Sequence, residues 1–306
     1  MSRRLLATVM LIAMSAGSWS VVTAQETATP QPGFEQSSEI VNVDGSVLGD
    51  IQVTDIDDAF ALYDSSTPPN YGMRYVAVTM DIHSTGERPW TFNSTHLVMV
   101  DDDGYAVTGS NPRFSEESRI ALLANQDIAP GATLTGSIVF QVALGAKLNW
   151  LVYSPANDRL VTVSRFGPAP PAIGAPVSVL ASDGSVIADI TVSVLVNPFT
   201  GYEQDSPPER GADFVLITVS VTNPGPRLMR LDPQAFLVID TDGFAERPVT
   251  IRRGDAPPPE LTYTDSFTAG SSTSGGLGYL VLSGVGLDRL VYSPSNDRLV
   301  EIADLG

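Results

Sequence analysis

Hydrophobic and polar residues alternate most regularly in two stretches that lie 139 residues apart. In residues 75–82 a valine, methionine or isoleucine occupies every second position, and residues 214–221 repeat the pattern. Side chains of a β-strand point alternately to its two faces, so a period of two indicates a strand with one buried face. Each stretch therefore predicts a central strand of a sheet that covers a hydrophobic core.

Turn sequences separate these strands from other short apolar runs. Residues 97–100 are followed by the motif Asp-x-Asp-Gly at 101–104, and residues 236–239 are followed by the same motif at 240–243. Aspartate and glycine favour tight turns, and glycine does so because it adopts a positive φ at little cost. We expect Gly86 and Gly225, which follow the two alternating strands, to supply positive φ in the same way.

One phrase occurs twice almost unchanged. Residues 151–161 read Leu-Val-Tyr-Ser-Pro-Ala-Asn-Asp-Arg-Leu-Val, and residues 290–300 differ from them only at Ser295. Proline followed by Asn-Asp favours a turn between strands, so we interpret the phrase as a hairpin that closes each copy, with a functional loop as the alternative. Arg159 beside Asp158 could tie this turn down, although an exposed ion pair is worth only about 0–1 kcal/mol.

The common offset indicates an internal duplication, in which residues 44–161 form the first repeat and residues 183–300 the second. Short apolar runs, frequent turn signals and the near absence of a helical period predict an all-β fold of two tandem immunoglobulin-like antiparallel β-sandwiches. The expected organisation is a signal peptide (1–24), a linker (25–38), sandwich 1 (39–165), a proline-rich linker (166–177) and sandwich 2 (178–306).

The first 24 residues are typical of a secretory signal peptide. Arg3 and Arg4 precede an apolar run over residues 5–14, and small residues end at Ala24, after which we expect cleavage. The apolar run is shorter than the roughly 20 residues that a membrane-spanning helix needs. We therefore expect a secreted or extracytoplasmic mature chain without a membrane span. The arginine pair leaves both general and twin-arginine export open.

The charge balance bears on the class of partner. The chain carries a formal charge of −18, which becomes −20 when Arg3 and Arg4 leave with the signal peptide, and it has no cysteine. Nucleic acids and anionic lipids need lysine and arginine to neutralise phosphates, so we expect neither as a partner. The expected partner is an unknown protein or envelope ligand. We expect it to contact the divergent segments 107–127 and 246–266, because binding residues concentrate on variable loops.

Several short motifs carry a resemblance to a known family. They are Tyr75-Val76-Ala77-Val78, Gly86, Asp103-Gly104-Tyr105, Pro130-Gly131 and Leu151-Val152-Tyr153, many of them repeated in the second half, although Ala269 replaces Pro130 there. The chain resembles secreted bacterial immunoglobulin-like domains of unknown function, which are related in fold to small secreted immunogenic proteins of mycobacteria. The resemblance implies an extracytoplasmic β-sandwich and transfers no catalytic residue.

The Asp-x-Asp-Gly motifs are the candidates for metal binding. Asp101 and Asp103 place two carboxylates at alternate positions, as calcium loops do, but the following residues lack the further ligands of an EF-hand. We interpret these motifs as β-turns. A calcium-stabilised, adhesin-like module is the alternative.

The residues that could support catalysis form weaker patterns than the metal-binding candidates. His83 and His96 are the two histidines, and their counterparts in the second repeat are Thr222 and Ala235. Asp57 with Asp102 represents the carboxylate pair that a secreted hydrolase needs. Aromatic residues could form a ligand platform or pack in the core; they are Tyr63, Tyr71, Trp90 and Tyr105. We expect a non-catalytic binding or structural module, with no catalytic, cofactor-binding or metal-binding residue.

Overall fold

The computed structural model describes residues 37–42, 44–116, 118, 120–156, 158–253 and 258–306. The predicted signal peptide (1–24) and residues 25–36 of the predicted linker lie outside these ranges. Among the described residues, helical structure is limited to two short 3-10 helices, Ser94–His96 and Pro233–Ala235. No helix in the described ranges has the length and apolar character needed to cross a membrane. The expected all-β class is confirmed.

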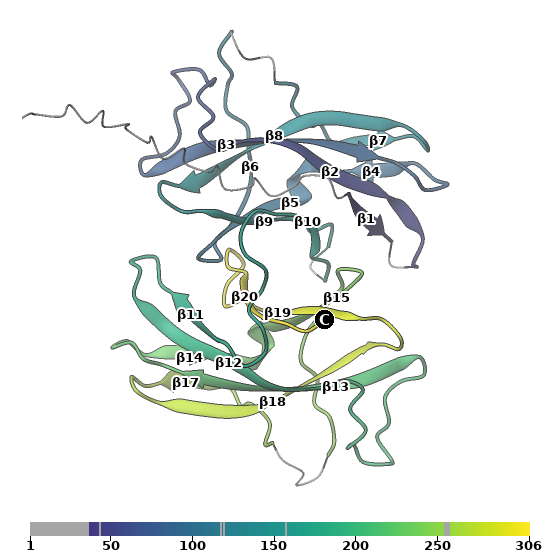
Figure 1. Cartoon of the computed structure of the whole chain (residues 1–306), viewed down its shortest axis with the longest axis vertical. Coiled ribbons are helices and arrows are strands. Elements are labelled where there is room, and N and C mark those ends of the chain that lie inside the picture. The colour runs from purple at the N-terminus through teal and green to yellow at the C-terminus, as the bar shows by residue number, and fades with distance from the viewer. Residues whose placement is uncertain (1–36, 43, 117, 119, 157, 254–257) are drawn as a thin grey trace, which may run out of the picture. The chain divides into compact units, whose positions relative to one another are not determined.

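Ten antiparallel strands lie in and around the first repeat (Figure 1). Their bounds are β1 (Ser38–Val41), β2 (Val47–Asp57), β3 (Met73–His83), β4 (Trp90–Phe92), β5 (Leu97–Asp101), β6 (Ala106–Ser110), β7 (Gln126–Ile128), β8 (Thr133–Ala143), β9 (Leu148–Tyr153) and β10 (Val161–Arg165). The main sheet has the order β1-β2-β3-β8-β6-β5-β9-β10, and β4 pairs with β7. Strand β6 pairs with both β8 and β5, so it joins the two layers of the sandwich.

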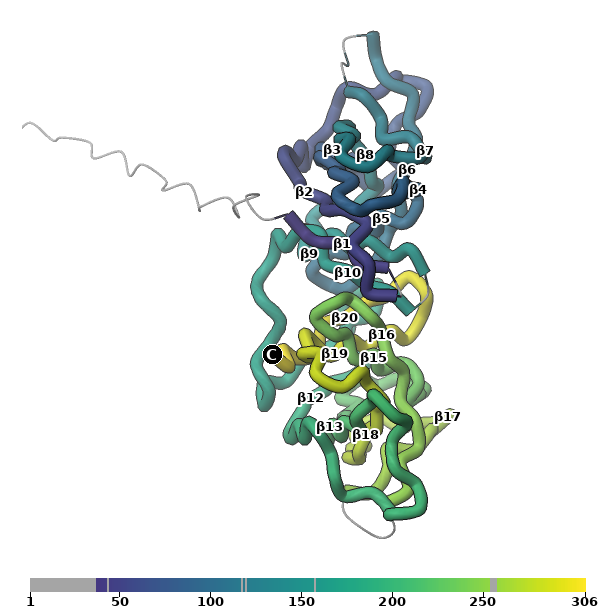
Figure 2. Tube along the Cα trace, turned by 90° about the vertical axis from the view of Figure 1, so that its right-hand side faces the viewer, coloured from purple at the N-terminus to yellow at the C-terminus, as the bar shows by residue number. Residues whose placement is uncertain are grey.

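The second repeat follows the same element order, and most of its strands begin 139 residues after their counterparts. Its strands are β11 (Pro176–Leu180), β12 (Val186–Val196), β13 (Ala212–Thr222), β14 (Met229–Leu231), β15 (Phe236–Asp240), β16 (Ala245–Glu246), β17 (Thr264–Phe267), β18 (Ser272–Leu282), β19 (Leu287–Tyr292) and β20 (Val300–Asp304). They form the sheets β11-β12-β13-β18 and β16-β15-β19-β20, and β14 pairs with β17. Figure 2 shows that the chain ends next to β20.

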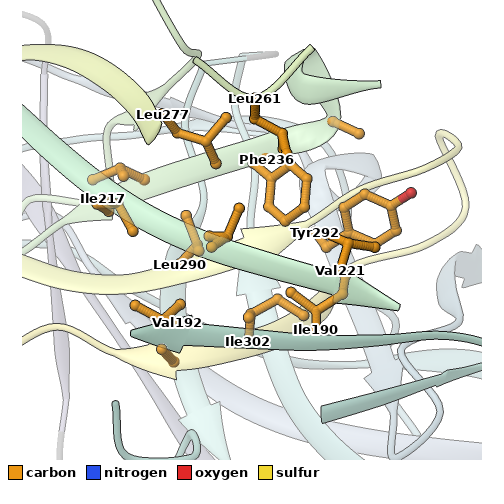
Figure 3. Close-up of a cluster of buried hydrophobic side chains, with 14 of the residues drawn as sticks. Ile190, Val192, Ile217, Val221, Phe236, Leu261, Leu277, Leu290, Tyr292 and Ile302 are labelled. Carbon is orange, nitrogen blue, oxygen red and sulfur yellow. The ribbon is translucent and has the colours of Figure 1, made fainter. Parts of the chain in front are cut away.

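The alternating residues form the cores, as predicted. In the second repeat Ile217, Val219 and Val221 of β13 are fully buried and pack against Phe236 of β15 and Leu290 of β19. Figure 3 shows Ile217, Val221, Phe236 and Leu290 together in this buried cluster. The first repeat builds an equivalent cluster from the inner faces of β2, β3, β5, β8 and β9. Two sheets that share one apolar interior define a β-sandwich.

The divergent segments pack against the sandwiches in both repeats: Phe114 lies over the outer face of the first sheet, whereas Leu261 joins the apolar core of the second repeat. In the first repeat Phe114 packs edge-to-face on Phe60 at a centroid distance of 5.9 Å, over the outward side of β3. In the second repeat Ile251 and Leu261 are buried, and Leu261 N–H donates to the carbonyl of Gly276 on β18 at 3.0 Å. These segments thus contribute to packing. Ligand binding by them remains a prediction.

The expectation for Gly86 and Gly225 was wrong. The described glycines with positive φ do not include these two, although they do include Gly104 and Gly243. A Cβ atom at Gly86 would lie 2.3 Å from the carbonyl oxygen of Val47, and one at Gly225 would lie 2.5 Å from that of Val186. Glycine is needed at both turns because another backbone segment passes too close for a side chain.

Candidate functional site

Each copy of the repeated phrase contacts the Asp-x-Asp-Gly turn of the other repeat. Leu160 N–H donates to the carbonyl of Gly243 at 2.7 Å, and Leu299 N–H, its counterpart, donates to that of Gly104 at 2.7 Å. A second reciprocal pair joins Ala106 N–H to the carbonyl of Asp297 (2.9 Å) and Ala245 N–H to that of Asp158 (2.8 Å). We call this region the junction. Its contacts have the self-complementary pattern of a two-fold interface.

Arginines of the phrase complete the junction. Arg159 Nη2 donates to the carbonyl of Asp242 at 3.1 Å, with its guanidinium 4.2 Å from the ring centroid of Phe244. Arg298 Nη2 likewise donates to the carbonyl of Asp103 at 2.9 Å, and its guanidinium lies 4.0 Å from the ring centroid of Tyr105. Arg159 is only 3% exposed. Arg159 is therefore not the exposed partner of its own turn that the sequence suggested, because its side chain reaches across to the other repeat.

Beneath these arginines lies an apolar cluster with members from both repeats. Val100 and Trp150 of the first repeat and Leu237 and Ile239 of the second are all buried in it. They come from the outward faces of β5, β9 and β15, the opposite side from the sandwich cores. Burial on both faces explains why these strands read as continuous apolar runs rather than alternating ones.

One side of the junction carries a buried charge network. Glu301 accepts hydrogen bonds from Arg165 at 2.5 and 2.7 Å and from Asn149 at 3.3 Å. Arg289 Nε lies 3.5 Å from the same carboxylate, and its guanidinium lies 4.4 Å from the ring centroid of Trp150. These contacts supply the partners that a buried carboxylate requires.

The aspartates at the start of the two turn motifs accept hydrogen bonds from backbone N–H groups of their own turns. Asp101 Oδ1 accepts the N–H groups of Asp103 (3.1 Å) and Tyr105 (2.8 Å), and Asp240 accepts the equivalent pair in its own turn. Burial raises the pKa of both carboxyl groups above the ordinary value, and the backbone hydrogen bonds act in the opposite direction. Within the described ranges, no group of three or more histidine or acidic side chains is placed to hold a metal ion. The β-turn interpretation accounts for these contacts.

A cavity of about 640 Å³ opens beside the first of these turns. Its lining includes Met73 at the start of β3, Met99 on β5, Val142 near the end of β8, Leu144 directly after it, and Ser182 between β11 and β12. The acidic turn 101–103 forms one side of its rim. We call it the Met73 cavity; its volume is within the usual range for small-ligand sites.

The other residues considered for chemistry lie apart from one another. His83 Nδ1 is 3.7 Å from Asp50, whereas His96 lies beside Asn93, and burial lowers the pKa of its imidazole. Asp57 ends β2 and Asp102 lies after β5, on separate elements. Trp90 is buried in the core, as expected of a packing residue, and of the other aromatic candidates only Tyr71 is fully exposed.

The junction and the Met73 cavity were both missed in the sequence. The junction had a signal: the apolar runs at 97–100 and 236–239 lack the polar positions of a strand with one solvated face. The cavity had none, because its lining comes from strand ends and turns that only the fold brings together.

The first repeat is similar to a known family. Residues 44–158 match the model of a family described as a domain of unknown function (DUF4352). A candidate lipoprotein from Bacillus subtilis is a similar solved structure, with a TM-score of 0.33 and 18% identity over 42% of this chain and 38% of that one. No curated protein matches at a significant level. The family match agrees with the expected domain of unknown function.

Proposed function

We propose that the chain is an exported, non-catalytic binding or structural module of the cell envelope or extracellular space. In this proposal it consists of two tandem immunoglobulin-like sandwiches, 39–165 and 178–306, joined by a proline-rich linker over 166–177. The signal-like pattern of residues 1–24 supports export. The β-sandwich fold and the match to a domain of unknown function agree with a module of this kind.

The reciprocal junction is the observation that carries the proposal. Its buried charged groups have structural partners: Asp101 and Asp240 accept turn amides, and Glu301 pairs with Arg165. A buried carboxylate whose hydrogen bonds are supplied by the protein itself has a structural role, which supports a non-catalytic module. Shared hydrogen bonds and a shared apolar cluster join the repeats into one unit, which suits a scaffold that presents fixed surfaces.

Export can be tested by fractionating cells that express the full chain and a version without residues 1–24. We expect the full chain in the envelope or medium fraction, shortened at Ala24, and the truncated version in the cytoplasm. Mass spectrometry of the mature amino terminus measures the cleavage site. Retention of both versions in the cytoplasm at full length would contradict the proposal.

Binding can be tested with a photo-crosslinking amino acid in the intact mature chain. We place it at Leu144, which lines the Met73 cavity, and at Leu228, an exposed leucine of the second repeat; the two are 64% and 65% exposed. We expect defined crosslinked products from envelope extracts at position 144 and none in common at position 228. Identical products at both positions, or none at 144, would contradict a binding role for this cavity.

A further inference from the structure

We propose that the Met73 cavity binds an extended polypeptide segment of a partner protein that carries an aliphatic side chain next to lysine or arginine. This inference rests on the proposed function as a non-catalytic binding module and names the ligand class. It follows from an apolar floor, a fixed wall and an acidic rim, which lie together around the ends of β3, β5 and β8, with Ser182 of the second half also in the lining.

The floor of the cavity is apolar and adaptable. Met99 and Val142 of the floor are buried and Met73 is half-buried, while Leu144 of the adjoining wall is 64% exposed. Covering an exposed leucine removes apolar surface from water, which favours an aliphatic ligand. Methionine is unbranched and flexible, so a floor with two methionines can adjust to aliphatic side chains of different shape.

The wall of the cavity is held in place before a ligand arrives. Residues 143–146 form the turn after β8, and Arg74 donates hydrogen bonds to the carbonyls of Ala143 (2.5 Å) and Ala146 (2.8 Å). Asp58 holds the same guanidinium through an ion pair at 2.8 Å. A preformed wall lowers the entropic cost of binding, because the turn does not have to be ordered by the ligand.

The rim selects the charge of the ligand. Asp102 and Asp103 are exposed at the edge of the cavity, within a chain whose formal charge is −18. A lysine or arginine side chain can extend over the apolar floor with its methylene groups while its cationic end reaches these carboxylates. The rim therefore complements a basic residue beside the aliphatic one and disfavours acidic segments.

The second repeat supplies natural control residues. Met73, Asp102 and Leu144 correspond to Ala212, Thr241 and Ser283, so each cavity residue has a smaller or uncharged counterpart at the equivalent place in the duplicated sequence. Replacing these three residues with their counterparts changes the cavity, and it introduces only side chains that the second repeat already carries at the equivalent positions. We therefore expect the three residues of the first repeat, and not their counterparts, to favour the proposed ligand.

The test uses the full mature chain and a fluorescent hexapeptide of alternating leucine and lysine, with binding followed by anisotropy. Companion peptides replace every lysine with glutamate or every leucine with serine. We expect saturable binding of the leucine–lysine peptide only. The double variant Met73→Ala and Leu144→Ser should bind at least about tenfold more weakly, because it removes apolar contact area. The control variant Leu228→Ser should bind like the unmodified chain.

The variant Asp102→Thr should weaken binding several-fold and reduce its dependence on salt, because a carboxylate of the rim is lost. Equal binding by the double variant and the unmodified chain would overturn the proposal, since it would show attraction to the acidic surface as a whole. Binding of the glutamate peptide, no saturable binding, or tighter binding of hexylammonium than of the peptide would also overturn it. Each of these results leaves the export measurement unaffected, so the ligand class can fail independently of the proposed function.

Discussion

The guanidinium of Arg159 lies 4.2 Å from the ring centroid of Phe244, although the two residues belong to different repeats. Arg298 and Tyr105 repeat the contact at 4.0 Å with the roles of the repeats exchanged. Each arginine comes from the twice-occurring phrase, and each ring follows an Asp-x-Asp-Gly turn. The two best-retained motifs of the chain therefore contact each other, and their contact explains why both copies keep them.

We expect Arg159→Met to destabilise the chain by about 1–3 kcal/mol, because it removes a buried cation–π contact and leaves the carbonyl of Asp242 without its donor. Urea denaturation of the mature chain measures the effect. The control is Arg230→Met, since Arg230 lies 5.0 Å from the Tyr263 ring with a side chain that is 65% exposed. Its cost should stay within about 0.5 kcal/mol. Equal losses in both variants would contradict the role of the junction.

Gly104→Ala separates backbone strain from crowding at the junction. Gly104 has φ +83°, and a Cβ atom there would lie 2.7 Å from Val300 Cγ2 and 2.9 Å from the carbonyl oxygen of Leu299. Gly145 has φ +87° and no atom within 4 Å of the same position, so Gly145→Ala reports strain alone. We expect Gly104→Ala to cost about 1–3 kcal/mol more in thermal or urea unfolding. A difference near zero would mean that the close approach is absent in solution.

The strands and the sandwich could be predicted because they depend on local periodicity. Val76, Val78, Met80 and Ile82 are all buried, as their alternation required. The junction could not be placed because alternation does not report which element covers the outer face of a sheet. Gly86 illustrates a second limit. A glycine in a turn can be needed for a positive φ or for the close approach of another backbone segment, and only the position of Val47 in the fold shows that the second reason applies. The cavity combines residues from several turns, whose distances depend on the whole fold.

The pH dependence of stability should identify Asp101 as a buried carboxylate. Its pKa is raised in the folded chain, so its contribution is fully present below the unfolded value of 3.8 and is lost as the pH rises through the folded value. Asp101→Asn keeps the acceptor for both turn amides and removes the titration. We therefore expect the stability of the variant relative to the unmodified chain to increase with pH across this window, as measured by urea denaturation.

Asp44→Asn provides the control with the opposite sign. Hydrogen bonds from Ser46 lower the pKa of the exposed Asp44, so its contribution is present above 3.8 and is lost as the pH falls through the lowered value. The stability of this variant relative to the unmodified chain should therefore decrease as the pH rises. The same slope for both variants would contradict the assignment of Asp101 as buried and Asp44 as solvated.

Tyr279→Phe should stabilise the chain by about 1 kcal/mol. Tyr279 is fully buried in the apolar core of the second repeat, its hydroxyl has no partner among the described residues, and Phe140 occupies the equivalent place in the first repeat. Burial also raises the pKa of the phenol well above 10.0. Thermal unfolding measures the change. Tyr153→Phe, which removes a phenol close to Trp90 in the first core, should destabilise instead.

Calcium should leave the unfolding temperature unchanged. Asp101 and Asp240 already accept two backbone amides each, and a cation would have to compete with those hydrogen bonds. Calorimetry with millimolar calcium and with excess chelator compares the midpoints, because a ligand that binds only the folded state raises its stability. A midpoint that rises with calcium would favour the adhesin-like alternative.

Glu301 and Thr162 occupy corresponding positions on the two sides of the junction, yet only one of them is charged. An assembly of two separate, identical chains would have to place the same side chain on both sides of its axis, and two buried glutamates would each need their own set of arginines. One polypeptide that carries both sides is free of this restriction. Because Glu301 supplies a carboxylate on one side and Thr162 a hydroxyl on the other, the two sides of the junction are chemically different. Neither half could therefore take the place of the other in this contact.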